Sequence, residues 1–144
     1  MKKNNKIVGH NYLFHHLIEL YQKNVLPNKI LLSGKKGIGK FLFSNHFVNY
    51  ILSQNEAYKY VLNNFEINDQ NKSYLLFKKN IHPNIFLLAK SNEKKYIEIS
   101  QIREMIKFQN NSSFNNKIKF IIIDNISDLN LNSTNALLKS IEEP

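Results

Sequence analysis

The sequence has 144 residues, which corresponds to one ordinary domain and leaves no room for a second full one. With 42% hydrophobic and 22% charged residues, its composition is that of a folded globular chain, since disordered chains carry too little apolar surface to offset the entropy of ordering. The absence of cysteine excludes disulfides, cysteine-ligated zinc, iron–sulfur clusters and thiol catalysis.

Most of the excess positive charge lies in residues 1–50. The formal net charge is +9, and residues 1–50 alone hold eight lysines against one glutamate. Such an excess favours polyanions, either a nucleotide's phosphates or a nucleic-acid backbone. An AT-rich genome, which favours lysine and asparagine, would explain it equally well. Arg103 is the only arginine, which argues against base-specific readout of DNA through arginine. No apolar run reaches the length of a signal peptide or membrane span, so we expect a cytoplasmic protein with no membrane partner.

Two amphipathic helices and one strand are predicted in the first third. Apolar residues recur every three or four positions over residues 12–21, which predicts a helix. A short apolar run over residues 29–33 ends at Gly34 and predicts a buried strand that runs into a turn. Helical spacing returns over residues 40–52, so the predicted order is strand, glycine loop, helix.

The middle of the chain is less informative. Residues 54–80 are polar and rich in asparagine, and they predict only a short helix and one further apolar patch. An apolar run at residues 85–88 follows His82-Pro83-Asn84, and Ser100 is the expected N-cap of a helix that buries the apolar positions after it.

The last third completes an alternating pattern. An almost continuous apolar run over residues 118–123 predicts a strand covered on both faces, as in parallel sheets. The final helix is expected to begin near Asn132 or Ser133. Strands that alternate with helices predict an α/β fold with a parallel sheet and flanking crossover helices, in which ligands bind at the carboxyl ends of the strands.

A glycine-rich loop carries the clearest chemical signal. It matches the first seven positions of the P-loop pattern with Gly34, Lys35, Lys36, Gly37, Ile38, Gly39 and Lys40. In such a loop the glycines let successive backbone N–H groups face phosphate oxygens, the following helix adds its positive N-terminus, and the lysine reaches the terminal phosphates. The predicted strand before it and helix after it favour this interpretation over a plain glycine turn with a solvated lysine.

Two positions differ from those of P-loop proteins that hydrolyse ATP. The eighth P-loop position, normally a Ser or Thr hydroxyl on Mg²⁺, is Phe41, whose ring cannot ligate that cation. Asp124 ends the 118–123 run, where P-loop proteins hold a metal-associated carboxylate, but the next residue is Asn125, which cannot accept a proton as a general base. Nucleotide binding is therefore compatible with the sequence, whereas hydrolysis is not expected.

Together these motifs resemble the N-terminal part of bacterial clamp-loader subunits of the AAA+ class, most closely the delta-prime subunits of DNA polymerase III. The segments that carry the resemblance are Ile7-Val8-Gly9-His10, Leu31-Leu32-Ser33-Gly34 with the P-loop, His82-Pro83-Asn84, Ile97-Glu98-Ile99-Ser100-Gln101-Ile102-Arg103, Ile121-Ile122-Ile123-Asp124 and Asn135-Ala136-Leu137-Leu138-Lys139 through Glu142-Glu143-Pro144. They cover most of residues 7–144 in the family's order.

The resemblance implies a P-loop AAA+ core and a non-hydrolysing role in the DNA polymerase III holoenzyme. It implies a subunit that helps load the sliding clamp onto primed DNA, with the gamma/tau and delta subunits as partners. It places Val8, Gly9 and His10 near the adenine of ATP, and Gly34 to Lys40 with Asp124 near its phosphates. Phe41 and Asn125 fit the silent delta-prime role better than that of a hydrolysing subunit.

The sequence also departs from the family. The zinc module that many members carry after the P-loop helix has no counterpart, because residues 54–80 contain no cysteine, so no zinc is expected. The family's sensor strand, arginine finger, lid and collar would lie beyond Pro144. We therefore expect residues 1–144 to be an incomplete portion of the AAA+ domain, with exposed apolar surface at a gap between residues 30–33 and residues 120–123. The alternatives are an ATP-hydrolysing gamma/tau-like subunit, a free-standing P-loop enzyme and a DNA-binding module.

Overall fold

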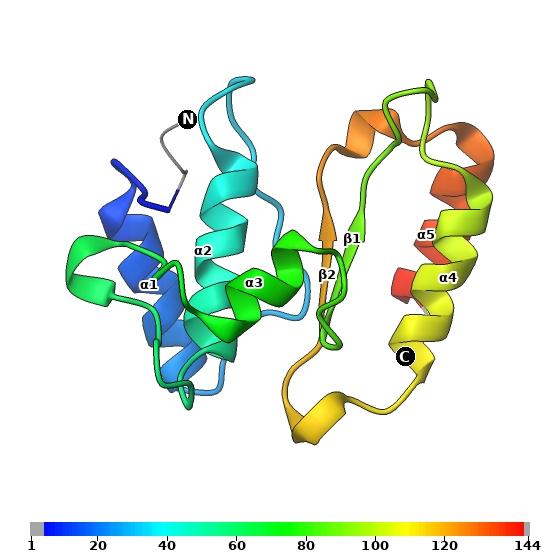
Figure 1. The fold of residues 1–144 in the computed structure, drawn as a ribbon. Helices are drawn as coiled ribbons and strands as arrows, with labels where there is room; N and C mark the ends of the chain where they lie inside the picture. Colours follow the sequence, from blue (N-terminus) through cyan, green and yellow to red (C-terminus); the bar gives the residue numbers. More distant parts are fainter. Residues whose placement is uncertain (1–4, 143–144) are drawn as a thin grey trace. The chain divides into compact units, whose positions relative to one another are not determined.

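The computed structural model describes residues 5–142, and the chain forms two compact units that divide between Leu76 and Phe77 (Figure 1). The predicted α/β class is confirmed, since the described residues form five α-helices and two strands that pair in parallel. The elements in chain order are α1 (Asn11–Gln22), α2 (Lys40–Leu52), α3 (Lys72–Lys78), β1 (Ile85–Leu88), α4 (Ile99–Asn110), β2 (Phe120–Ile123) and α5 (Leu131–Glu142), with short 3-10 turns at Leu62–Asn64, Phe114–Asn116 and Ile126–Asp128.

Phe14 on α1 is the centre of the first unit's core. Its side chain is 1% exposed, and its ring meets those of Phe43 and Phe47 on α2 edge to face, with centroids 5.5 and 6.1 Å away. The shell is completed by the rings of Tyr50, Tyr60 and Phe65. Edge-to-face pairs add about 0.5–1.5 kcal/mol each beyond the apolar area they bury. The helices predicted at residues 12–21 and 40–52 are confirmed, and this ring cluster joins them.

A buried polar pair ties α2 to the segment after it. His46 is fully buried, and its Nδ1 lies 2.8 Å from the hydroxyl of Tyr60. Burial raises the pKa of Tyr60, so the phenol keeps its proton and remains available to the imidazole. The backbone N–H of Tyr60 also donates to Ser53 Oγ at 2.9 Å.

Polar side chains organise residues 54–80, the stretch in which the sequence predicts least. The fully buried Asn71 donates from Nδ2 to the carbonyl of Tyr58 at 2.8 Å. Its Oδ1 accepts from Asn49 Nδ2 at 2.8 Å and from the backbone N–H of Tyr74 at 2.7 Å. One asparagine therefore joins α2, the loop and α3, and periodicity of apolar residues cannot reveal such a link.

The strand predicted at residues 29–33 is wrong. A strand requires hydrogen bonds to a neighbour, and within residues 5–142 the backbone of this stretch makes none and belongs to no strand. Ile30 and Leu31 are 44% and 73% exposed, so the expected exposed apolar surface is present here. The residues have the composition of a buried strand, but they pair with no strand in the part of the chain that the structure describes.

The second unit is built on the parallel pair β1 and β2. Ile85 lies opposite Phe120 and Leu88 opposite Ile123. Every side chain of β2 is buried or half-buried, but the strand predicted over residues 118–123 is too long, since β2 begins at Phe120 and Ile118 is 47% exposed. Helices α4 and α5 pack beside the pair over a core formed by Leu88, Ile97, Ile102, Met105 and Leu137.

The prediction that Ser100 is the N-cap of α4 is also wrong. The N-cap is Glu98, two residues before the expected Ser100, and the backbone N–H of Glu98 donates to Gln101 Oε1 at 2.9 Å. The same Gln101 donates from Nε2 to the carbonyl of Ala89 at 2.8 Å, just beyond β1. Because one glutamine both caps α4 and holds it to the end of β1, the helix begins earlier than a serine cap predicts. The last helix likewise begins at Leu131, one residue before the predicted range.

Two side chains hold the connection from α4 to β2. Asn84 is 1% exposed; its Nδ2 donates to the carbonyl of Phe114 at 3.1 Å, and its Oδ1 accepts from the N–H of Phe114 at 3.0 Å. Lys119 donates to the carbonyl of Gln109 at 2.8 Å, and its ammonium lies 5.0 Å from the ring centroid of Phe108. A cation beside the last carbonyls of a helix also stabilises the helix dipole.

We expect Phe14→Ala to lower the free energy of unfolding of the intact protein by about 3–5 kcal/mol, because it empties the centre of the ring cluster. Chemical denaturation of the two proteins checks this. Tyr12→Ala on the same helix is the control, since that side chain is 86% exposed and its removal should change stability by about 0.5 kcal/mol or less. Equal losses in both variants would contradict the assigned core.

We expect Asn84→Ala to destabilise the protein by about 1–3 kcal/mol, because it removes the acceptor of the Phe114 N–H and one of the two donors to the Phe114 carbonyl, which keeps the N–H of Lys117. Thermal unfolding of the variant against the unchanged protein measures the loss. Asn132→Ala removes an exposed asparagine from α5 and should leave the midpoint almost unchanged. A neutral Asn84 variant would show that the loop is held by other contacts.

Candidate nucleotide-binding site

The glycine loop leads directly into α2. Gly37 and Gly39 have φ angles of 83° and 95°, in the left-handed region where side chains are strained and glycine is favoured. Gly39 is the N-cap of α2, whose first turn carries no acidic side chain. The positive end of a thirteen-residue helix dipole therefore meets the loop without a competing carboxylate, which favours an anion there.

Lys40 folds back over this loop. Its Nζ donates to the carbonyls of Gly34 and Lys35 at 2.9 and 3.0 Å. An ammonium has three donors, and the described residues provide no acceptor for the third. The loop thus holds a cation with one free N–H, while Lys35, Lys36 and Ile38 are exposed beside it. The geometry suits a phosphate oxygen.

The segment expected near adenine lies just before α1. Val8 is 87% exposed, and Gly9 and His10 both have left-handed φ angles, of 85° and 57°. The stretch before it is held by backbone bonds, from Ile7 N–H to the carbonyl of Phe65 at 3.0 Å among others.

The first unit brings this segment and the P-loop to the same end of its two long helices. Phe14, in the first turn of α1, contacts Phe43, in the first turn of α2. At the other end, Gln22 donates to the hydroxyl of Tyr50 at 3.5 Å. The helices therefore run in the same direction, and Figure 1 shows both beginning at the top of the view.

Phe41 is half-buried on the first turn of α2 and offers no metal ligand. The first hydroxyl along this helix is that of Ser44, and it donates to the carbonyl of Phe41 at 2.8 Å. No hydroxyl therefore replaces the missing Mg²⁺ ligand on this turn. The loop fits phosphate, but it does not fit the metal that usually accompanies it.

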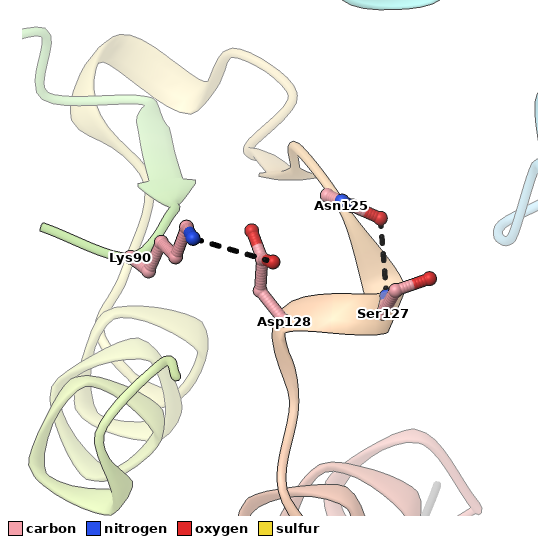
Figure 2. A network of polar contacts seen from close by, with 4 residues as sticks. All are labelled: Lys90, Asn125, Ser127 and Asp128. Carbon is pink, nitrogen blue, oxygen red and sulfur yellow. Dashed lines mark hydrogen bonds and ion pairs between the residues drawn. The ribbon is translucent and has the colours of Figure 1, made fainter. Parts of the chain in front are cut away.

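Asp124 and Asn125 belong to the second unit, at the carboxyl end of β2. The N–H of Asp124 donates to the carbonyl of Leu88 at 3.1 Å, and its side chain is exposed. Asn125 Oδ1 accepts from the N–H of Ser127 at 3.1 Å and so caps the turn after β2 (Figure 2). The Asn125 carboxamide is not basic and is already used as a cap, so it cannot take a proton from water.

Figure 2 also shows a charged residue that sequence reasoning missed. Lys90, just beyond β1, lies 4.0 Å from Asp128, so a cation and a carboxylate meet near the carboxyl ends of the two strands. No local sequence signal marks this pair, because it depends on the parallel register of β1 and β2. Among residues 5–142 no three histidine, aspartate or glutamate side chains gather in a metal-binding group. No helix in that range is long and apolar enough to span a membrane.

Comparison with known proteins identifies the family. A family model described as DNA polymerase III, delta subunit, matches residues 9–144. The chain is also 30% identical over 114 residues, 79% of its length, to the DNA polymerase III subunit delta' of Pseudomonas aeruginosa, of which it spans 33%. The predicted resemblance is thus confirmed for most of the sequence: this chain belongs to the DNA polymerase III delta-subunit family and is delta-prime-like.

Proposed function

We propose that this protein is a non-hydrolysing clamp-loader subunit that helps place the sliding clamp on primed DNA during replication. Its partners in this role are the other clamp-loader subunits, of the gamma/tau and delta types, and through them the clamp and the DNA. Family membership supports this role, and the chain spans about a third of the curated relative it matches.

The proposal depends on one contrast. The P-loop suits phosphate, but the helix turn after it lacks the hydroxyl that usually binds Mg²⁺. Gly37, Gly39 and Lys40 have the backbone angles and the free donor that suit phosphate. Phe41 and Asn125 lack the two groups that hydrolysis requires, a hydroxyl for Mg²⁺ and a base for water. We infer a site that takes ATP phosphates without cleaving them and that contributes to assembly rather than turnover. The proposal includes no zinc, because residues 54–80 contain no cysteine.

We expect the native protein, captured from its source cells with an antibody to residues 90–117, to bring other clamp-loader subunits with it. Mass spectrometry identifies what is captured, and a non-immune antibody provides the control. A free-standing P-loop enzyme would come alone. Capture without any clamp-loader subunit would overturn the assembly role.

The full-length protein should show no ATPase activity by itself, because neither metal nor water is positioned. Phe41→Thr combined with Asn125→Glu restores the two missing groups and should raise phosphate release measurably above that background. Lys40→Met added to this double variant is the matched control and should abolish any gain, since it removes the phosphate-facing cation. Robust activity of the unchanged protein would instead support the hydrolysing gamma/tau-like alternative.

A further inference from the structure

The first turn of α2 offers Mg²⁺ no side-chain ligand. Phe41 follows Lys40 directly and is half-buried, and the first hydroxyl along the helix, that of Ser44, already donates to the Phe41 carbonyl at 2.8 Å. Mg²⁺ requires oxygen ligands in a nearly ideal octahedron and gives up its waters reluctantly. An aromatic ring in this place therefore gives the ion nothing in exchange for a lost water.

The first unit has no carboxylate that could replace the missing hydroxyl. The acidic residues in the described part of this unit lie outside the loop and the first turn of α2: they are Glu19, Glu56, Glu66 and Asp69. P-loop proteins usually hold Mg²⁺ with a hydroxyl and a carboxylate together. Because Phe41 provides no hydroxyl, Asp124 of the second unit would be the only member of that pair to remain.

The charge of the loop favours a phosphate that carries no metal. Residues 20–55 contain five lysines and no acidic residue, and Lys35 and Lys36 are exposed beside the folded-back Lys40. Mg²⁺ cancels part of the negative charge of a nucleotide. A metal-free nucleotide is therefore attracted more strongly to this loop than its magnesium complex is.

We propose that Phe41 makes the P-loop selective for metal-free nucleotide, and therefore for ADP over ATP when Mg²⁺ is present. A triphosphate carries more negative charge than a diphosphate and binds Mg²⁺ more tightly, so Mg²⁺ depletes free ATP before it depletes free ADP. This inference rests on the proposed function, because it requires a nucleotide at this loop. It goes further by naming the form of nucleotide that is bound.

The test measures binding of ADP and ATP to the full-length protein by equilibrium dialysis, once in EDTA and once in excess Mg²⁺. Equal ionic strength in the two buffers keeps the screening of charges the same. Both nucleotides should bind in EDTA, and excess Mg²⁺ should weaken each of them about ten-fold or more, because a charged contact is lost and none replaces it. At a Mg²⁺ concentration that complexes most of the ATP but little of the ADP, ADP should bind more tightly.

A pair of variants isolates the hydroxyl. Phe41→Thr restores the metal ligand, so Mg²⁺ should strengthen binding to this variant instead of weakening it. Phe41→Val is the matched control, since valine has the size and branching of threonine without the hydroxyl, and it should keep the preference for metal-free nucleotide. Lys40→Met should weaken binding in both buffers, which would assign the binding to this loop.

The comparison of the two buffers needs only the unchanged protein, so it remains decisive if a variant fails to fold. Equal or tighter binding in Mg²⁺ would overturn the inference, while the nucleotide site and the clamp-loader role would stand. The same response to Mg²⁺ in Phe41→Thr and Phe41→Val would also overturn it. If neither nucleotide binds in EDTA, the inference fails together with the nucleotide contact in the proposed function, and capture of the other clamp-loader subunits tests the assembly role independently.

Discussion

The contact of Phe14 with the rings of α2 is the interaction on which the candidate site depends. It holds the first turns of α1 and α2 side by side, and so brings the Val8–His10 segment and the glycine loop to one end of the helix pair. A P-loop works only when its backbone is held in place, because loop amides and the helix dipole act over short distances. Within residues 5–142 no strand pairs with residues 29–33, so the aromatic cluster is the packing that holds the start of α2.

Buried amides perform a second structural task in both units. Two buried amides, Asn71 and Asn84, and one half-buried amide, Gln101, each join two or more segments through hydrogen bonds of 2.7–3.1 Å. A buried amide stabilises only when its donors and acceptors are satisfied, so each of these positions tolerates few replacements. The abundance of asparagine in the sequence, which suggests only a compositional bias, includes residues that hold loops in place.

In the proposed function, phosphate binding and ATP hydrolysis depend on different side chains. The loop keeps the left-handed glycines and a lysine with a free donor, which are the groups that meet phosphate. Phe41 on the first turn of α2 carries no hydroxyl that could bind a metal, and Asn125 in the second unit caps the turn after β2.

The sequence alone determined the family, the helices at residues 12–21 and 40–52, most of the strand predicted at residues 118–123 and the identity of every P-loop position. These depend on periodicity and on short motifs, which are local. Only the tertiary structure decided that residues 29–33 are unpaired, that α4 begins at Glu98 and that Lys90 meets Asp128. The physical reason is the same in each case: strand pairing, capping across segments and ion pairs depend on partners that are distant in the chain, and no local pattern encodes them.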